Sequence, residues 1–366
     1  MASSWHRVAQ LLCVWCAYVF LGTSLNAQGA AAAASQLGKV IALGGPSYNG
    51  YMPAMDIPPK ARSGVRAVAA GGLHSMAIVG KRRLVVEWPP LNYSWWGPAP
   101  DPSTYTSPPK GLSGVQAIAA GDAHSLALLK SGKVVMWMRQ LLGGGKDVVP
   151  PAVAAAKVKA IAAGRAGFSM ALTRNGSVLE WPARDYAANF TRPPPPEVLS
   201  GGVRAVAAGW DHCLALLENG TVVAWGGAKG SGASVRALNV PPTALSNVVA
   251  IAAGYQHSMA LLANGTVVAW GATLSTPGRA TCAALSCRHP PPPPAGLNAV
   301  PAIALSNVTA ISAGRDYAMV LLRGGQVFVW GKSSSNLAID LIPPEASSQV
   351  FAISAGPMHW LAVRPV

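Results

Sequence analysis

One short sequence pattern recurs seven times along the chain, and this recurrence restricts the fold more than any other feature. Each copy has an apolar run of the type Val-x-Ala-Ile-Ala-Ala, a glycine, and a second apolar run that often begins with histidine. The intervals between consecutive glycines range from 42 to 60 residues. A constant unit at variable spacing indicates one repeated structure with loops of different length. The marker glycines of the seven copies are Gly71, Gly121, Gly164, Gly209, Gly254, Gly314 and Gly356.

Each copy predicts three short β-strands. The two apolar runs are the first and second strands, and a tight turn follows, which is Asn-Gly at Asn175, Asn219 and Asn264. Asn-Gly favours a hairpin because a type I′ turn needs positive φ at both central residues. The third strand is Val-Val-x-Trp, and units of this length and strand content are typical of β-propeller blades. Six copies end this strand with a tryptophan: Trp88, Trp137, Trp181, Trp225, Trp270 and Trp330.

The two ends of the chain share one copy of the repeat. The seventh copy stops at Val366, before its turn and third strand. The missing strand is near the N-terminus, where residues 38–45 (GKVIALGG) align with residues 220–227 (GTVVAWGG). Such a strand closes a ring of blades, because it pairs with the last blade and covers its open edge. A linear solenoid would not need a strand from the opposite end of the chain. We therefore predict an all-β, seven-bladed β-propeller over residues 38–366, closed by an N-terminal strand completing the last blade.

The N-terminus predicts secretion. His6 and Arg7 precede an apolar stretch from Val8 to Gly22, after which small and polar residues follow. This order is that of a secretory signal peptide, so we expect residues 1–27 to be a signal peptide and residues 28–37 an alanine-rich linker. A retained signal anchor is the alternative, and only then would the protein be held at a membrane.

The charge favours acidic partners. The chain has 28 Lys and Arg against 13 Asp and Glu, a formal net charge of +15. The basic residues are scattered, and the densest run is Lys81-Arg82-Arg83, so a basic surface that is merely solvated is an equal alternative to a polyanion-binding face. For a secreted chain we expect an extracellular protein or an anionic polysaccharide as partner, not nucleic acid, and we expect a monomer.

Long insertions follow the third strands and carry the residues predicted to bind a partner. They include residues 89–109, 181–198 and 271–300, and they should all emerge on one face of the disc. Loops clustered on a rigid scaffold often bind partners, although solvated polyproline spacers are the alternative. The predicted binding face consists of Tyr93, Trp95, Trp96, Arg184, Tyr186, Arg192, Lys229, Arg279 and Arg288.

The insertions also predict two modifications. Cys282 and Cys287 stand five residues apart, where a disulfide could staple the loop. A metal pair is the alternative, but no second pair completes a tetrahedral site. Asn92 and Asn189 begin Asn-x-Ser/Thr motifs in insertions and are the predicted glycosylation sites. Cys213, in an apolar strand, is expected to be a small buried side chain.

Catalysis is not predicted. Acidic residues are few, and no serine recurs beside them as a nucleophile. A metal ring of histidines is conceivable, but hydrogen bonds from each histidine to local backbone are the preferred interpretation, because a ring keeps the side chains apart. We expect no catalytic residue, metal or cofactor. The histidines at one repeat position are His74, His124, His212, His257 and His359, with Gly167 and Tyr317 in the other two copies.

The repeat resembles the regulator of chromosome condensation family. The matching unit, V-x-A-I-A-A-G-x-x-H-S-L-A-L-L-x-x-G-x-V-V-x-W-G, is clearest at residues 203–226 and 248–271. The spacing within residues 240–251 resembles most the bacterial β-lactamase inhibitor protein II branch, and the repeats are also similar to the extracellular propellers of crinkly-type plant receptor kinases. The resemblance covers residues 38–366 and implies the propeller fold.

The resemblance implies no single function, because its members include a nuclear exchange factor, an ultraviolet-B receptor and the scaffold of an enzyme inhibitor. The chain also departs from the family after the third strand, where W-G-x-N-x-x-G-Q is replaced, so no relative's partner carries over. Trp210 is the clearest tryptophan outside the repeat position. We expect a secreted binding scaffold without enzymatic activity. The alternative is an intracellular guanine-nucleotide-exchange or chromatin-associated regulator.

Overall fold

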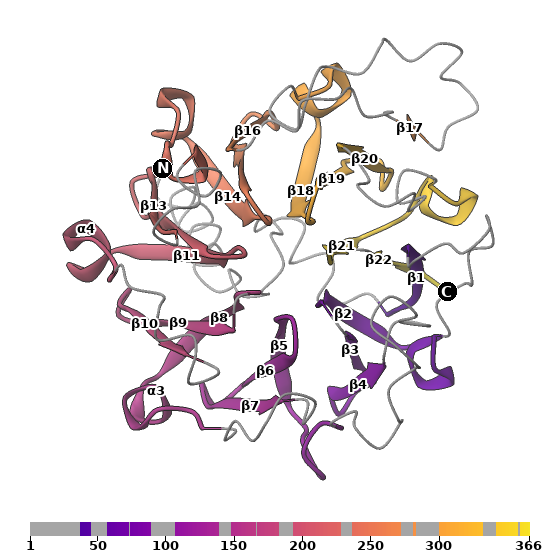
Figure 1. The fold of residues 1–366 in the computed structure, drawn as a ribbon. Coiled ribbons are helices and arrows are strands. Elements are labelled where there is room, and N and C mark those ends of the chain that lie inside the picture. Colours follow the sequence, from indigo (N-terminus) through magenta and orange to yellow (C-terminus); the bar gives the residue numbers. More distant parts are fainter. Residues whose placement is uncertain are drawn as a thin grey trace, which may run out of the picture.

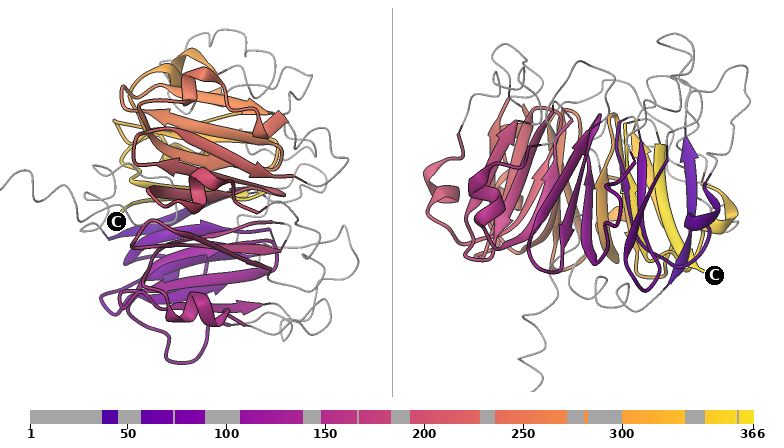
Figure 2. Two further views of the ribbon diagram at one scale, coloured as in Figure 1. Left: turned by 90° about the vertical axis from the view of Figure 1, so that its left-hand side faces the viewer. Right: turned by 90° about the horizontal axis from the view of Figure 1, so that it is seen from below.

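The computed structural model arranges the chain as a ring of β-sheets around a central axis (Figure 1). Seen from the side, the ring is a disc whose strands run between its two flat faces (Figure 2). This confirms the predicted seven-bladed, all-β propeller. The structure describes residues 37–44, 57–72, 74–88, 107–138, 148–165, 167–182, 193–227, 236–271, 281–282, 300–331, 342–357 and 359–366.

Each of the first six blades has an inner, a middle and an outer strand, paired antiparallel in that order. The inner strands are β2 (Val65–Ala70), β5 (Val115–Ala120), β8 (Val158–Ala163), β11 (Val203–Ala208), β14 (Val248–Ala253) and β18 (Val308–Ala313). The middle strands are β3 (Ser75–Val79), β6 (His124–Leu129), β9 (Phe168–Thr173), β12 (His212–Leu217), β15 (His257–Leu262) and β19 (Tyr317–Leu322). The outer strands are β4 (Leu84–Trp88), β7 (Val134–Met138), β10 (Val178–Pro182), β13 (Val222–Gly226), β16 (Val267–Gly271) and β20 (Val327–Gly331).

Short elements complete the blades. A two-residue strand, β17 (Thr281–Cys282), pairs with β20. Several inner strands follow a short helix that begins next to a proline, whose fixed φ suits a first helical turn. These helices are η2 (Pro59–Ala61), α3 (Pro151–Ala155), α4 (Pro196–Leu199), η7 (Pro242–Ala244), η8 (Ala302–Leu305) and η9 (Pro344–Ala346).

The seventh blade joins the two ends of the chain. Its inner and middle strands are β21 (Ala352–Ala355) and β22 (His359–Pro365), and its outer strand is β1 (Gly38–Gly44). The pairing of β1 with β22 runs without interruption from Gly38 opposite Pro365 to Gly44 opposite His359. The predicted closure is therefore confirmed, and it leaves the final strand with a neighbour on each side.

The core lies between blades as well as within them. Leu126 and Leu128 of the second blade pack in one cluster with Ile161 and Trp181 of the third. The repeat tryptophans are buried, and two of them bond the preceding blade: the Nε1 atom of Trp137 donates to Glu87 Oε2 at 2.6 Å, and that of Trp225 to Glu180 Oε1 at 2.9 Å. Each blade thus buries its apolar faces against its neighbours, as repeat proteins do.

The marker glycines are required by close packing. None of them has a positive φ, so their backbone conformation would suit other residues. A Cβ atom on Gly121 would overlap the His124 ring, and one on Gly254 would overlap His257 and approach the Gly314 carbonyl. The N–H group after a marker glycine donates to the marker carbonyl of the next blade, as from Trp210 to Gly254 at 3.1 Å. Only glycine leaves room for this inner ring of backbone contacts.

Strand directions define the two faces of the disc. Ala70, Ser75 and Trp88 pair side by side, so the inner and outer strands of a blade end together. We call this side the marker face, because the marker glycines lie there. The other side, where the inner strands begin and the middle strands turn into the outer ones, is the turn face.

The predicted signal peptide, residues 1–27, and residues 28–36 of the predicted linker lie outside the described residues. Within the described ranges, no helix has the length and hydropathy needed to cross a membrane.

Candidate functional site

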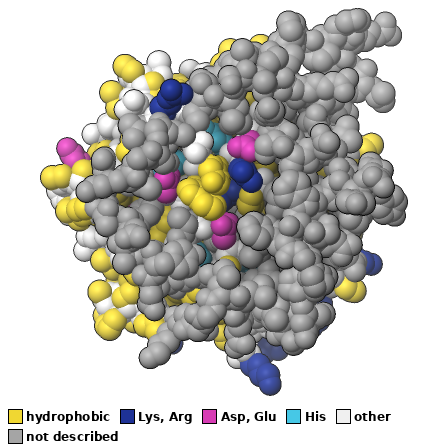
Figure 3. Space-filling model, viewed as in Figure 1, with side chains coloured by type: hydrophobic (Ala, Val, Ile, Leu, Met, Phe, Trp, Pro, Cys, Tyr) yellow, Lys and Arg dark blue, Asp and Glu magenta, His cyan; other side chains and the backbone are white. Residues whose placement is uncertain are grey.

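The residue after each marker glycine lies at the marker face, close to the axis, because it follows an inner strand. This position holds Gly72 in the first blade and Pro357 in the seventh. In the blades between them it holds large or charged residues, and Figure 3 shows apolar, basic and acidic side chains together at the centre of this face. We call this group, which consists of Asp122, Arg165, Trp210, Tyr255 and Arg315, the axial cluster.

Three members of the axial cluster stack. The ring centroids of Trp210 and Tyr255 are 4.4 Å apart with planes tilted by 33°, an arrangement favoured for aromatic pairs. The guanidinium carbon of Arg315 lies 5.2 Å from the Tyr255 ring centroid, within the range of a cation–π interaction. The Nε atom of Arg315 is also 3.5 Å from Asp316 Oδ2, while its side chain stays 46% exposed. The stack therefore offers a partly exposed aromatic surface beside a cation.

Arg165 contributes a second, deeper cation. Its Nη1 atom is buried and has no hydrogen-bond partner among the described residues. Burial lowers the pKa of Arg165, and the charge of Asp122 in the neighbouring blade opposes this shift. An arginine keeps its proton in proteins, so Arg165 remains a cation, with a donor that no described residue uses. A buried charge is costly unless it is paired, so Arg165 is an energetically unfavourable feature of the axial cluster.

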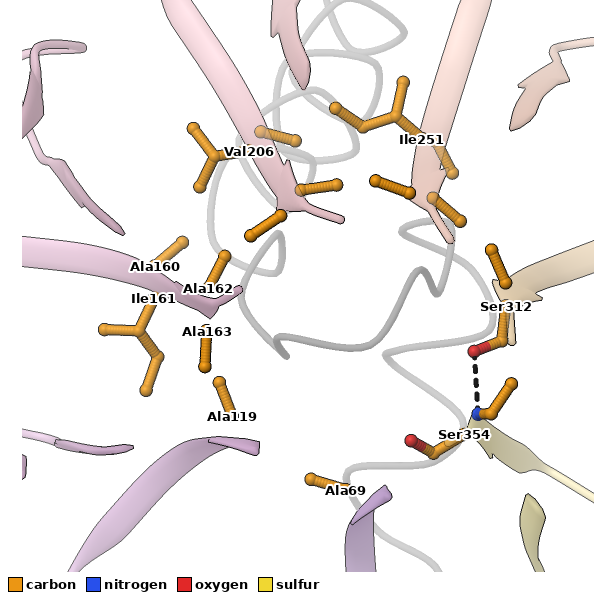
Figure 4. Close-up of a pocket in the computed structure, with 18 of the residues that line it drawn as sticks. Ala69, Ala119, Ala160, Ile161, Ala162, Ala163, Val206, Ile251, Ser312 and Ser354 are labelled. Carbon is orange, nitrogen blue, oxygen red and sulfur yellow. Dashed lines mark hydrogen bonds between the residues drawn. The ribbon is translucent and has the colours of Figure 1, made fainter. Parts of the chain in front are cut away.

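A cavity of about 180 Å³ lies on the axis beneath the cluster and is lined by the inner strands (Figure 4). Alanines such as Ala69, Ala119 and Ala162 point into it. Ser312 and Ser354 also line it, but each hydroxyl accepts a backbone N–H of the next blade, from Ala355 and Ala70 respectively, at 3.0 Å. The cavity is smaller than the usual small-molecule pocket and has room for a side chain or a few waters.

The repeat histidines join neighbouring blades. In four of them the Nε2 atom bonds the serine that follows the corresponding histidine position in the next blade, a partner that the sequence interpretation of local backbone bonds missed. Within the described ranges, no group of three or more His, Cys, Asp or Glu side chains could hold a metal ion. The four pairs are His74–Ser125 at 2.9 Å, His124–Ser169 at 3.1 Å, His212–Ser258 at 3.1 Å and His359–Ser75 at 2.9 Å.

The third blade corrects the sequence alignment. Phe168, not Gly167, occupies the histidine position, since β9 begins at Phe168 as β12 begins at His212. The turn after Gly164 is one residue longer than in the other copies. Phe168 therefore lies in an apolar environment and shares a core cluster with Cys213 of the next blade.

Cys213 is fully buried, as expected for a small core side chain. Burial raises the pKa of its thiol, and the nearby Glu180 carboxylate acts in the same direction. Because the thiolate is the reactive form of cysteine, this thiol is inert at neutral pH.

The residues predicted from sequence to bind or to be modified fall outside the described part of the chain. This holds for all nine predicted binding residues, for Asn92 and Asn189, and for Cys287. Cys282 is placed by its backbone in β17, opposite Phe328. The axial cluster was missed, although its position has a sequence signal: it is a highly variable column between the invariant marker glycine and the second strand.

Four segments of the chain match the family model described as the regulator of chromosome condensation (RCC1) repeat: residues 115–137, 203–228, 248–272 and 308–336. Together with the fold, these matches define the class of the protein. It is a seven-bladed β-propeller, four segments of which are similar to regulator of chromosome condensation repeats. Among curated protein sequences, none matches the chain.

Several solved structures share the fold. Prp20p from Saccharomyces cerevisiae is 19% identical with a TM-score of 0.60, and the match covers 94% of each chain. Human WBSCR16 is 18% identical with a TM-score of 0.58, covering 91% of this chain and 100% of that one. The crinkly ectodomain of the Arabidopsis thaliana receptor kinase ACR4 is 18% identical with a TM-score of 0.51, covering 80% and 90%. These matches lend no support to a closer likeness to the β-lactamase inhibitor branch, which stays a prediction.

Proposed function

We propose that this propeller is a secreted, non-enzymatic binding scaffold that recognises an extracellular protein or an acidic glycan through its marker face. The observation that carries the proposal is the axial cluster, which combines a stacked aromatic pair, an exposed arginine and a buried arginine donor. Trp, Tyr and Arg are the residue types that most often dominate binding energy at interfaces.

The strand ends support a role for the whole marker face. The outer strands end beside the start of the middle strands, as Gly226 lies opposite His212. The insertions predicted to bind follow these ends, so they leave the blades on the same side as the axial cluster. A partner held by the loops would therefore meet the cluster at the centre of its footprint.

The chemistry of the cluster favours an acidic contact. A carboxylate or sulfate at the centre of the marker face would lie near the exposed guanidinium of Arg315 and above the buried charge of Arg165. Hydrogen bonds between ionised groups are about twice as strong as neutral ones. Asp122 and Asp316 prevent the site from being purely basic, so the partner must place its charge with some precision.

The alternative is an intracellular exchange or chromatin-associated regulator. It is favoured by the likeness to Prp20p, whose structure is described together with its binding to Gsp1p and histones. The likeness to the ACR4 ectodomain shows that the same fold also serves as a receptor ectodomain. The location of the full chain carrying a C-terminal tag decides between them, since secretion requires that residues 1–27 act as a signal.

The proposed secretion carries two further proposals, a Cys282–Cys287 disulfide and glycans on Asn92 and Asn189. Non-reducing peptide mapping tests the first. A mobility shift on glycosidase treatment, reduced in an Asn92→Gln and Asn189→Gln double variant, tests the second.

The binding proposal is tested by capture of partners on the purified full chain, followed by titration of the captured species. Arg315→Glu is expected to weaken binding by about tenfold, the equivalent of about 1.4 kcal/mol. Arg323→Glu is the matched control, because it makes the same charge change in the same blade at the turn face and should leave binding unchanged. Circular dichroism and Tm verify the fold of both variants. Equal binding by wild type and by Arg315→Glu, Trp210→Ala and a deletion of residues 183–192 would contradict the proposal.

A further inference from the structure

Basic residues that are scattered in the sequence gather at the turn face and its rim in the first three blades. They come from the turns between middle and outer strands and from the segments that lead into the inner strands. All of them are exposed. We call this group, which consists of Lys60, Arg62, Lys81, Arg82, Lys110, Lys130, Lys133, Lys157 and Arg174, the basic arc.

Backbone hydrogen bonds make the arc continuous. Each turn bonds the start of the inner strand in its own blade or in the next, so the segments that carry the charges lie side by side across three blades. The bonds are Gly80 N to Gly64 O at 2.8 Å, Gly114 N to Arg82 O at 2.9 Å, Lys130 N to Gly114 O at 3.1 Å, Val158 N to Gly132 O at 3.3 Å and Arg174 N to Lys157 O at 2.8 Å.

The described residues of the first three blades place no acidic side chain at the turn face. The acidic residues that the structure describes in these three blades are Glu87, Glu180 and Asp122. The two glutamates bond tryptophans of the next blades near the marker face, and Asp122 belongs to the axial cluster. No described acidic residue of these blades therefore offsets the nine cations at the turn face, and a positive field raises the local concentration of an anionic ligand.

The other blades show that the arc is not a general property of the surface. Their exposed turn-face and rim residues include Glu197, Glu218 and Glu345 alongside Arg323. Arg204, in the fourth blade, is partly buried and uses its guanidinium to bond the Val248 carbonyl at 2.8 Å. Among the described residues, one side of the turn face is thus strongly basic and the rest carries charges of both signs.

We propose that the basic arc binds a linear sulfated polysaccharide. The sulfates of such a polymer are regularly spaced along its length. They can contact cations at regular intervals, because each blade carries its basic turn next to that of the preceding blade. The described turns and lead-in segments that carry the arc contain no aromatic residue, so they offer no platform for stacking unpaired bases. The helix η2, which carries Lys60, has three residues and is too short to enter a DNA groove as a recognition helix.

This inference rests on the secretion that we propose above, because sulfated polysaccharides are outside the cell. It adds a second binding face. The polysaccharide would occupy the turn face while the marker face, on the other side of the disc, stays open to a partner. The propeller would then present its axial cluster away from the polymer.

Titration of the full chain with a heparin oligosaccharide tests the proposal. A Lys81→Glu and Lys130→Glu double variant should weaken binding by about tenfold, or about 1.4 kcal/mol, and should elute from immobilised heparin at lower salt. The matched control is an Arg236→Glu and Arg323→Glu double variant, which makes the same charge change at exposed positions of other blades. It should lose less than about twofold, as expected for general screening. Tm values show that both variants are folded.

Three results would overturn the proposal. Equal losses in the two double variants would show that net charge alone attracts heparin. Unchanged binding in the arc variant would place the heparin elsewhere. Binding of a DNA duplex as tight as that of heparin at the same ionic strength, with the same loss in the arc variant, would make nucleic acid the ligand. Arg315→Glu separates this proposal from the function of the marker face, because it should retain heparin binding.

Discussion

The joint that closes the ring and the joint between the fifth and sixth blades use the same repeat positions with different results. At the closing joint, the His359 Nε2 atom bonds Ser75 Oγ at 2.9 Å, and the Ala70 N–H donates to Ser354 at 3.0 Å. At the other joint, His257 meets Ala318 where the repeat places serine, and both of its ring nitrogens are buried without a hydrogen-bond partner. Unpaired buried polar atoms are costly, so this joint must be stabilised in another way.

Apolar packing supplies that stability. Met259 and Leu261 of the fifth blade share one core cluster with Ile311, Phe328 and Trp330 of the sixth. The closing joint also has an apolar cluster, to which β1 contributes Val40. Apolar packing between blades can therefore form a joint without a histidine–serine bond. Such a bond adds to the packing where the sequence supplies both partners.

The largest change in stability is expected at Gly254, the marker glycine at the joint between the fifth and sixth blades. A Cβ atom on Gly254 would overlap His257 and press on the Gly314 carbonyl, whereas one on Gly356 at the closing joint would meet its neighbours at 3.0 Å. Gly254→Ala should therefore lower the free energy of unfolding by about 3 kcal/mol, and Gly356→Ala by less. Gly324→Ala is the control, because nothing lies within 4 Å of its Cβ position. Chemical denaturation measures all three, and equal losses would contradict the close-packing account.

The histidines of both joints predict a loss of stability in acid. Burial lowers the pKa of His257 to about 3 and that of His359 to about 4, both below the ordinary value of 6.5. The unfolded chain therefore binds more protons than the folded one below pH 6.5, so each neutral histidine contributes stability that is lost as pH falls toward its folded pKa. At pH 5 the loss should be about 2 kcal/mol for each group.

His257→Tyr sharpens this prediction. Tyr317 holds the same position in the sixth blade after a turn of equal length, and its hydroxyl donates to the Gly356 and His359 carbonyls. The tyrosine variant should therefore fold and should show a shallower decline of Tm between pH 7 and pH 5. The same decline in wild type and variant would assign the acid sensitivity to other groups.

Much of the fold could be predicted from the sequence, because repetition makes local signals consistent. The Asn-Gly turns, the alternating strands and the displaced copy at residues 38–45 all pointed to one closed ring. The contacts across joints could not be read in the same way, because they pair one copy with the next. Once the order of blades in the ring is known, however, the sequence shows which joints have both partners. His74 has Ser125 opposite it, whereas His257 has Ala318 and so lacks a hydroxyl to bond.

The candidate site was less predictable. The nine residues that the sequence predicts to bind a partner lie outside the described structure. The axial cluster comes from single residues in five separate copies, such as Arg165 and Tyr255, and only the ring brings them together. The clustering of the basic arc could not be predicted from the sequence for the same reason. Lys81 and Lys130 are far apart in the chain but lie on adjacent turns in the structure.

Removing the hydroxyl from the closing joint should have an intermediate effect. Ser75→Ala leaves the buried Nε2 atom of His359 without its partner, which typically costs about 1 to 3 kcal/mol. A double-mutant cycle with His359→Phe isolates the pair, since the serine should contribute little when the imidazole is absent. Additive losses would show that the bond does not stabilise the ring.

Adding a hydroxyl at the joint between the fifth and sixth blades should change the free energy of unfolding least, and the change should be stabilising. Ala318 pairs with Ala313 and Trp330, as Ser75 pairs with Ala70 and Trp88, so the surroundings already suit a serine. Ala318→Ser gives His257 the partner that the other histidines have, which should raise the free energy of unfolding by about 1 kcal/mol.

The same substitution in a His257→Phe background should be unfavourable, because the new hydroxyl then lacks its partner. A change of sign between the two backgrounds, measured by chemical denaturation, is the expected result. A loss in both would mean that the fifth and sixth blades are held at a spacing that the bond cannot span. Apolar packing would then have replaced the histidine–serine pair at this joint instead of merely tolerating its absence.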